Sequence, residues 1–434
     1  MRRNLGIGLT FIGALAVLGI GSAVLEKKAT VEAAGAQAPR FEVDPMWPKP
    51  LPNHWVMGNT IGVSVDSKDH IWIIHRAGSL EAKEVYATTN PPGSECCKPA
   101  PAVLEFDEEG NLLGSWGGTD GPGYEWPASN HGITVDYKGN VWIGGNGRTA
   151  NAPATAETAG NTAPGAPAAQ AKQAAKAKAA PGGPPLYHDS MVLKFTQEGK
   201  FLMRIGKTGA SQGSNDTENL GLPAKIFVDA KTNELYIADG YGNKRVIVFD
   251  ADSGKYKRHW GAYGHKPEDT NLGPYRPDAP VAQQFRNPVH CAELSVDGLL
   301  YVCDRVNDRI QVFKPAGTFV KETFIAKNTL GDGSVWDIAF SKDPQQKYMF
   351  LADGSNEKIY IILRETMEIL TSFGDGGRQP GQFYAVHSIA ADSKGNLFTT
   401  ETYRGQRVQK FLYKGLAPVP KKDQGVVWPK GTKG

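Results

Sequence analysis

One pattern recurs along the chain: a short apolar run, a turn rich in Asp, Gly or Asn, and a second apolar run that ends in a polar residue. Residues 62–76 read GVSVDSKDHIWIIHR, and residues 132–144 read GITVDYKGNVWIG. The arrangement returns at residues 226–239, 292–304, 338–353 and 389–401. Two apolar runs joined by such a turn predict a β-hairpin. We therefore predict six copies of one hairpin unit.

A second pair of short apolar runs follows most copies. These pairs are 103–106 with 112–116, 192–195 with 201–205, 246–249 with 256–260, 310–313 with 319–324, and 359–363 with 368–373. A repeated unit of four short strands is typical of a β-propeller blade, which buries its faces against neighbouring blades. The sequence predicts an all-β, six-bladed β-propeller over residues 41–434. The strand that completes the ring could come from residues 41–43 or 426–428.

One segment interrupts the repeats within the second copy. Residues 149–185 are dominated by Ala, Pro, Gly and Lys and contain few large apolar side chains. Such a segment buries too little apolar surface to offset the entropy lost on ordering. We predict a disordered insertion here, interpreted as a tolerated loop, with a tether or lid as the alternative.

The beginning of the chain has the pattern of an export leader. Arg2 and Arg3 precede an uncharged apolar run over residues 5–25, and small residues follow at 33–36. The run is long enough to span a bilayer, so residues 1–36 are predicted to be a cleaved signal peptide or an N-terminal anchor. In both cases we expect the propeller in the periplasm or outside the cell.

The charge balance limits the classes of partner. Lys and Arg total 48 against 45 Asp and Glu, for a net charge of +3. Nucleic-acid binding requires a clustered excess of basic residues, so that class is excluded. We expect membrane contact only through the N-terminal segment and a small-molecule or peptide-amide substrate. The sequence contains no signal for an oligomeric state.

Four cysteines in an exported protein invite pairing. Cys291 and Cys303 lie on either side of a predicted turn, so a hairpin could join them in a disulfide; two buried, unpaired thiols are the alternative. Cys96 and Cys97 are adjacent in a Pro-flanked loop. Unpaired loop cysteines are the commoner outcome there, with a two-cysteine ring or a soft metal site as alternatives.

Three histidines occupy one equivalent position of the repeat. His131, His290 and His387 precede the first apolar run of the second, fourth and sixth copies, whereas the odd-numbered copies carry Ile61, Ala224 and Trp336. Alternate blades of a six-fold ring project side chains toward the axis about 120° apart, so the three imidazoles would converge. Zn²⁺ accepts three His nitrogens and leaves a fourth position open. We predict a zinc site; three separate turn histidines are the alternative.

The repeats at residues 239–249 and 304–313 resemble NHL repeats, with Asp followed by Arg-Val-Ile-Val-Phe or Arg-Ile-Gln-Val-Phe. The histidine constellation resembles peptidyl-α-hydroxyglycine α-amidating lyase, a six-bladed NHL propeller with zinc on three such histidines. Two further family motifs, Phe-His-Arg-Gly and Ala-Asp-Gly-Tyr, match Ile-His-Arg-Ala at 74–77 and Ala-Asp-Gly-Tyr at 238–241. The resemblance implies that Arg76 and Tyr241 are catalytic.

This resemblance also implies a reaction. The family cleaves the C–N bond of an α-hydroxyglycine amide to give an amide and glyoxylate. Zinc would act as a Lewis acid on the hydroxyl group. Tyr241 would be the base, and Arg76 could hold the carboxylate through paired hydrogen bonds.

A calcium ion is the second metal that the resemblance implies. The family holds it with backbone carbonyls at positions matching Val63 and Ile133, and with an Asp directly after the third histidine. That position is Ser388 here, which is a poor substitute for an anionic oxygen ligand. Asp337, the matching residue of the fifth copy, could supply the missing charge.

Two other functions remain open from the sequence. One is a metal-dependent hydrolase, such as a lactonase, on the same scaffold. The other is a non-enzymatic NHL propeller that binds a protein or a glycan, since a fold alone does not determine function. A binding module has no need of a channel metal, so metal content distinguishes it from both enzymes.

Overall fold

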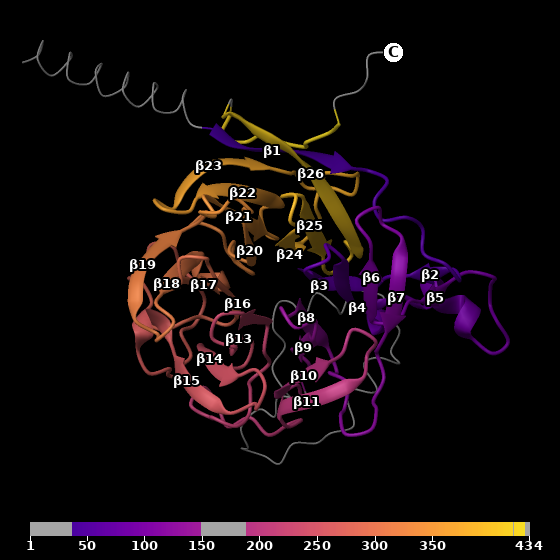
Figure 1. Ribbon diagram of the computed structural model, residues 1–434, viewed down its shortest axis with the longest axis horizontal. Helices are drawn as coiled ribbons and strands as arrows, with labels where there is room; N and C mark the ends of the chain where they lie inside the picture. Colours follow the sequence, from indigo (N-terminus) through magenta and orange to yellow (C-terminus); the bar gives the residue numbers. More distant parts are fainter. Residues whose placement is uncertain (1–36, 149–187, 420, 430–434) are drawn as a thin grey trace, which may run out of the picture.

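The computed structural model describes residues 37–148, 188–419 and 421–429. Six four-stranded antiparallel sheets are arranged around a central axis, as Figure 1 shows. The predicted six-bladed β-propeller is confirmed. The leader predicted at residues 1–36 and the insertion predicted at 149–185 lie outside the described residues.

The first three blades run in chain order from the innermost strand outward. Blade one contains β3 (Asn59–Val65), β4 (Ile71–Arg76), β6 (Val103–Phe106) and β7 (Leu112–Trp116). Blade two contains β8 (Asn130–Val135), β9 (Val141–Gly145), β10 (Met191–Phe195) and β11 (Phe201–Gly206). Blade three contains β12 (Lys225–Asp229), β13 (Glu234–Asp239), β14 (Arg245–Asp250) and β15 (Tyr256–Trp260).

The other three blades complete the ring. Blade four contains β16 (Val289–Leu294), β17 (Leu300–Asp304), β18 (Arg309–Phe313) and β19 (Phe319–Phe324). Blade five contains β20 (Asp337–Phe340), β21 (Tyr348–Asp353), β22 (Lys358–Leu363) and β23 (Glu368–Phe373). Blade six contains β24 (Val386–Ala391), β25 (Leu397–Glu401), β26 (Arg407–Pro418) and β1 (Gln37–Asp44).

The N-terminal strand closes the ring. β1 pairs antiparallel with β26, so blade six is built from both ends of the described chain. The ring of Phe41 lies 5.4 Å from that of Phe350 and 5.5 Å from that of Phe373, between blades six and five. The other candidate segment runs beside β1, where Val43 donates a backbone hydrogen bond to Val427. Of the two closing segments considered from the sequence, the structure uses the first.

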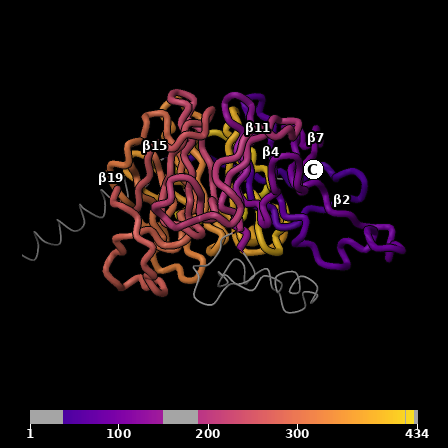
Figure 2. Tube along the Cα trace, turned by 90° about the horizontal axis from the view of Figure 1, so that it is seen from below, coloured from indigo at the N-terminus to yellow at the C-terminus, as the bar shows by residue number. Residues whose placement is uncertain are grey.

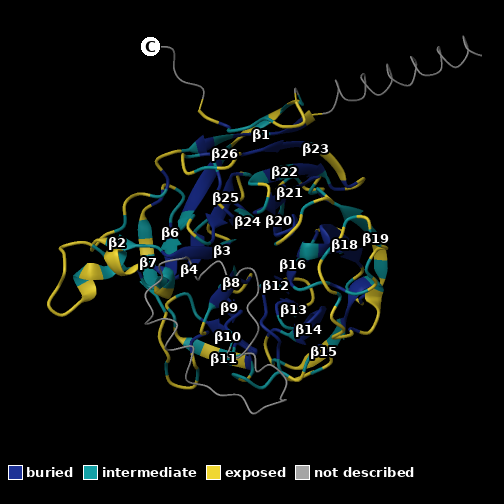
Figure 3. Ribbon diagram, turned by 180° about the vertical axis from the view of Figure 1, so that it is seen from behind, coloured by how far each residue is buried: buried dark blue, intermediate teal, exposed yellow. Residues whose placement is uncertain are grey.

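The core lies between neighbouring blades. In one cluster, Trp72 of blade one packs with Ile143 and Phe195 of blade two. In blade three the two middle strands, β13 and β14, are buried on both faces, whereas the outermost strand, β15, begins with exposed residues (Figure 3). Burying each sheet face against a neighbour explains why the short apolar runs recur around the whole ring.

Recurrent polar residues hold the turns and blade edges. Asp136 accepts a hydrogen bond from Trp142 Nε1 at 2.9 Å, and Asp66 does the same for Trp72 at 3.1 Å. At the opposite end of the blades, Asp239 pairs with Arg245 at 2.8 Å, with both side chains fully buried. These bonds explain the Asp and Arg positions of the repeat, because buried charges require partners.

A side excursion leaves blade one. It contains the 3₁₀ helices η1 (Ala77–Ser79) and η2 (Ala82–Thr88) and the short parallel pair β2 (Trp55–Val56) and β5 (Lys98–Pro99). In the side view of Figure 2, β2 lies at the edge of the body. Two more 3₁₀ helices, η3 (Ala262–Gly264) and η4 (Arg305–Asn307), lie in the connections of blades three and four.

Among the described residues, no helix is both long enough and apolar enough to cross a bilayer.

Candidate metal centre and active site

The three predicted histidines meet on the propeller axis. His131, His290 and His387 lie near the start of the innermost strands β8, β16 and β24, and at most 3% of each residue is exposed. Their ring centroids are 4.8 to 5.1 Å apart. One nitrogen of each ring lies within 4.8 Å of the others, so one ion could contact all three.

The Nδ1 atom of each histidine lies within hydrogen-bonding distance of a backbone carbonyl in the next blade. The distances are 2.8 Å from His131 to Ala224, 2.5 Å from His290 to Trp336, and 2.6 Å from His387 to Ile61. These acceptors are the residues that occupy the histidine position in the odd-numbered blades. In the tautomer that donates from Nδ1 to a carbonyl, Nε2 is the nitrogen that holds the lone pair.

A glycine next to His131 lets β8 lie close to the Ala224 carbonyl of blade three. A Cβ atom at Gly132 would lie 2.4 Å from the Ala224 carbonyl oxygen, which is the partner of His131. Any larger residue would push β8 away from blade three.

The donor set fits a divalent metal ion. Three neutral imidazoles with carbonyl-bound Nδ1 atoms match the ligands of catalytic zinc sites, and they also suit other late first-row ions. The predicted metal site is supported to that extent, and the geometry leaves the identity of the metal open.

Tyr241 approaches two of the three histidines from blade three. Its hydroxyl lies 2.9 Å from Nε2 of His131 and 3.0 Å from Nε2 of His290. The residue follows β13 directly after Gly240, where a Cβ atom would lie 2.0 Å from the Val289 carbonyl oxygen. The close packing of blades three and four therefore requires glycine before the tyrosine.

Arg305 is a site residue that the sequence reasoning missed. It donates from Nη1 to the Tyr241 hydroxyl at 3.2 Å, and its guanidinium carbon lies 4.3 Å from the centroid of the Trp336 ring. Asp332 lies 3.5 Å from Nη2 of Arg305 and accepts a hydrogen bond from the Tyr403 hydroxyl at 3.0 Å. The Tyr241 hydroxyl therefore lies between two imidazoles and a guanidinium.

Repeat alignment contained a signal for Arg305 and for Tyr403, which the sequence analysis did not single out. Arg305 comes directly after Asp304, the last residue of β17. Arg76 occupies the equivalent position in blade one, directly after His75. Tyr403 lies two residues after Glu401, as Tyr241 lies two residues after Asp239. Each pair belongs to opposite blades of the ring.

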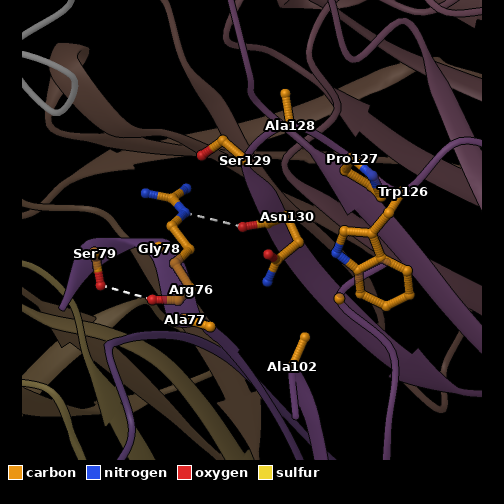
Figure 4. Close-up of a pocket in the computed structure, with 11 residues that line it drawn as sticks. Arg76, Ala77, Gly78, Ser79, Ala102, Trp126, Pro127, Ala128, Ser129 and Asn130 are labelled. Atoms are coloured by element: carbon orange, nitrogen blue, oxygen red, sulfur yellow. Dashed lines mark hydrogen bonds between the residues drawn. The ribbon is translucent and has the colours of Figure 1, made fainter. Parts of the chain in front are cut away.

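Arg76 lies at the edge of the centre. It donates from Nε to the Asn130 carbonyl at 3.0 Å (Figure 4). It also donates from Nη2 to the Asn146 side chain at 2.8 Å. Asn130 directly precedes His131. The neighbouring His75 is fully buried, and burial lowers its pKa to about 4, so its ring is neutral and accepts a hydrogen bond from the Gly58 amide.

Asp337, the residue considered as a calcium ligand, is paired with the ammonium group of Lys225. Lys225 Nζ lies 2.6 Å from Asp337 and 2.8 Å from Glu293. The other carboxylate oxygen of Asp337 accepts from the Ser388 hydroxyl and the Ile389 amide. Burial opposes the charged form of Lys225, yet the two carboxylates outweigh it and raise the pKa of the lysine.

The set implied for calcium therefore does not fit that ion here. Val63 and Ile133 lie on the innermost strands as expected, and both border a channel cavity of about 240 Å³ that Lys225 and Glu293 also line. Asp337, however, is already neutralised by a cation, and a calcium ion beside the ammonium would be repelled by it. The cation at this level of the channel is the protein's own Lys225 ammonium, paired with Asp337 and Glu293.

A second histidine-carboxylate cluster lies in blade one. His70 Nδ1 is 2.8 Å from Glu105, with Asp66 close by. Asp66 is engaged by Trp72 and by the Lys68 and His70 amides, which are the bonds of the ordinary repeat turn. We assign this cluster to the fold.

All four cysteines are paired. Cys291 and Cys303 form a disulfide between β16 and β17, where they are directly opposite. Cys96 and Cys97 form a disulfide with each other in the side excursion, instead of the unpaired loop cysteines that the sequence favoured.

Comparison with known proteins gives distant similarities. No protein-family model matches the chain. It is 35% identical over 122 residues to peptidyl-glycine alpha-amidating monooxygenase B of Xenopus laevis, covering 28% of this chain and 12% of that protein. Identity to peptidylglycine alpha-amidating monooxygenase of Rattus norvegicus is 31% over 273 residues, covering 61% of this chain and 22% of that protein. The chain thus matches less than a quarter of the length of these relatives.

A third relative is matched over a large share of both chains. NHL repeat-containing protein 3 of Mus musculus is 23% identical over 337 residues, which is 75% of this chain and 67% of that protein. Among solved structures, a streptogramin B lyase aligns with a TM-score of 0.46 at 12% identity, over 88% of this chain and 99% of that one. Virginiamycin B lyase from Staphylococcus aureus aligns with a TM-score of 0.40 at 14% identity, over 83% and 82% of the two chains. The chain is a six-bladed propeller with distant similarity to the amidating monooxygenases and to NHL repeat-containing protein 3.

Proposed function

We propose that this protein is a metal-dependent lyase that cleaves the C–N bond of α-hydroxyglycine-type amides. The substrate R–CO–NH–CH(OH)–COO⁻ would yield R–CO–NH₂ and glyoxylate. The hydroxyl loses its proton, the C–N electron pair moves to nitrogen, and nitrogen gains a proton, so the reaction needs no oxidant or reductant. The similarity to the peptidylglycine alpha-amidating monooxygenases and the match of the Arg76 and Tyr241 motifs support this assignment.

One observation carries the proposal: three buried imidazoles converge on the channel axis, and the Tyr241 hydroxyl lies beside two of them. Tyr241 is 2.9 Å and 3.0 Å from two of these nitrogens, so a substrate hydroxyl beside them would also be beside the phenol oxygen. A zinc ion held by His131, His290 and His387 would supply Lewis acidity to that hydroxyl. A base must lie within hydrogen-bonding reach of the proton that it removes, and Tyr241 satisfies this condition.

The two arginines have distinct tasks in this proposal. Arg305 donates to the Tyr241 hydroxyl, and a neighbouring positive charge favours the phenolate form that accepts the proton. Arg76 lies on the opposite blade and offers its guanidinium to the polar end of the substrate. Both side chains are at least nine-tenths buried, so their charges act in a region of reduced water content.

The test is metal analysis combined with glyoxylate release. The purified protein is compared with His131→Ala, His290→Ala and His387→Ala, and with His70→Ala from the blade-one cluster as the matched control. We expect about one zinc per chain in the wild type and in His70→Ala. Each channel variant should lose the metal together with glyoxylate release from an α-hydroxyglycine amide.

Other outcomes would replace this proposal. Bound zinc without glyoxylate release from any α-hydroxyglycine amide would favour a hydrolase on the same metal. A protein that binds no metal after refolding with zinc would leave an NHL-type propeller that serves as a binding module.

We also propose that the protein acts outside the cytoplasm. The apolar segment that follows Arg2 and Arg3 supports export, and so do the two disulfides, because disulfides persist in oxidising compartments. Detection of the mature protein in a periplasmic or extracellular fraction would test this; recovery in the cytoplasm would contradict it.

A further inference from the structure

A cavity at the outer edge of blade four has no role in the reaction described above. Its volume is about 240 Å³. One side is the loop over residues 272–286, which leads from blade three to blade four. The other side is the end of the sheet where Arg309 of β18 pairs with Phe324 of β19, the outermost strand of that blade (Figure 1). The described residues that line the cavity include neither the three histidines nor Tyr241 and Arg305, so it is separate from the metal centre.

Positive charge dominates the wall of this cavity. Arg276, Arg286 and Lys327 line it, and so does Arg309. Arg309 is neutralised by Asp304, which lies 2.7 Å from its Nε atom. Within the described residues, no carboxylate lines the cavity, and none lies within ion-pairing distance of the other three cations. A hollow lined by charges of one sign attracts the opposite sign, so the cavity favours an anion.

Arg286 is half-buried without an ion-pair partner among the described carboxylates. Its Nε atom donates to the Asn307 side chain at 3.0 Å, and Nη1 donates to the Gly273 carbonyl. Its guanidinium carbon lies 5.9 Å from the centroid of the Tyr275 ring. Burial lowers the pKa of Arg286, although the charge of Asp304 acts in the opposite direction. Withdrawing a cation from water costs free energy that neutral partners offset only in part, and an oxyanion beside the guanidinium would supply the missing counter-charge.

The loop on one side of the cavity is held in place. Pro274, Pro277 and Pro280 restrict its backbone, because a proline ring fixes φ. The Tyr275 hydroxyl donates to the Lys327 carbonyl at 2.8 Å, which joins the loop to the segment after β19. The backbone on both sides of the cavity is therefore set before a ligand arrives, and this lowers the entropic cost of binding.

We propose that this cavity binds the oxyanion group of a small molecule, either a carboxylate or a phosphate. Arginine presents a planar fork of N–H donors that matches both groups. A volume of about 240 Å³ is slightly below the range of about 300–1,000 Å³ that is usual for drug-sized ligands, so the ligand is a small molecule. The proposal does not depend on the lyase function, because none of the cations that carry it takes part in that reaction.

The experiment measures anion binding by calorimetry on the whole zinc-loaded chain at low ionic strength, with inorganic phosphate and succinate as the two probes. The double variant Arg276→Met/Lys327→Met removes two of the three cations at exposed positions and keeps the structural hydrogen bonds of Arg286. Lys200→Met, also at an exposed position, is the matched control. His387→Ala is a second control, because it disrupts the channel metal site and leaves the cavity intact.

We expect at least one of the two anions to bind the wild type with a Kd below about 1 mM, and this Kd to rise at least tenfold in the double variant. Lys200→Met and His387→Ala should keep the wild-type Kd. Binding of only one probe would support the site and identify its oxyanion group.

Three results would overturn the proposal. They are the absence of binding by both anions, a Kd that is unchanged in the double variant, and a loss of binding in His387→Ala, which would place the anion on the channel metal. Because the measurement uses no α-hydroxyglycine amide, a protein without lyase activity still gives a decisive result.

Discussion

The Nζ atom of Lys225 lies 2.6 Å from Oδ1 of Asp337, joining blade three to blade five inside the channel. Glu293 approaches the same ammonium at 2.8 Å, and burial raises the pKa of Glu293 although Lys225 lies beside it. The lysine is thus the cation that holds two carboxylates together where the family resemblance implied calcium. A lysine in place of calcium therefore distinguishes this chain from the family that it resembles, in the part of the channel next to the histidines.

Replacing this lysine should destabilise the propeller. Lys225→Met leaves two buried carboxylates without their partner, which costs about 3–5 kcal/mol of unfolding free energy. Thermal unfolding should show a lower Tm than the wild type, and added Ca²⁺ should restore part of it only in the variant. Lys200→Met, at an exposed position, is the control. A wild-type Tm that falls on treatment with a calcium chelator would contradict the assignment.

Removing the Tyr241 hydroxyl should separate catalysis from metal binding. Tyr241→Phe keeps the three imidazoles, so zinc content should match the wild type. The kcat for glyoxylate release should fall about 10²- to 10⁴-fold, the usual contribution of a general base. Tyr403→Phe, which removes the hydrogen bond to Asp332, should have a much smaller effect. Undiminished kcat in Tyr241→Phe would remove the tyrosine from the mechanism.

Stability should depend on pH through Asp353. The equivalent carboxylates Asp239 and Asp304 pair with arginines, whereas Lys358 in blade five pairs with Asp423 instead. Burial raises the pKa of Asp353 from 3.8 to about 7, so the folded protein keeps a proton that the unfolded chain releases. The free energy of unfolding from this group therefore falls as pH rises from about 4 to 7.

Asp353→Asn should weaken that dependence; Asp308 and Glu357, whose pKa values burial also raises to about 7, keep the rest of it. We expect the variant to be more stable than the wild type at pH 8, by on the order of 2 kcal/mol, with the difference shrinking toward pH 4. Urea unfolding at several pH values measures it, and Asp278→Asn at an exposed position serves as the control. A variant less stable than the wild type at pH 8 would show that the carboxylate is ionised and favourable in the fold.

Closure of the ring by β1 gives a further prediction. Phe41 is 3% exposed and packs on Phe350 and Phe373, so Phe41→Ala should cost about 3–5 kcal/mol of unfolding free energy. Met46, which is 80% exposed, should tolerate Met46→Ala within about 0.5 kcal/mol. Equal denaturation midpoints for the two variants would show that β1 contributes little to closure.

Much of the fold was readable from local pattern. The bounds predicted for 256–260, 319–324 and 368–373 are those of β15, β19 and β23, because period-two apolar patterns and turn residues act over short distances. Equivalence of repeat positions also predicted that His131, His290 and His387 would converge. A symmetric ring converts a shared position in sequence into a shared position in space.

Other features depend on contacts between blades. The sequence contained both candidate closing segments, and only pairing with β26 distinguished β1 from the C-terminal tail. The carbonyl partners of the histidines, the bond from Arg305 to Tyr241 and the pairing of Lys225 with Asp337 all join residues of different blades. The sequence alone therefore determined the repeat, its number and the convergence of the three candidate metal-binding histidines. The tertiary structure decided which side chains surround them, because such partners are set by the packing of distant segments and not by local pattern.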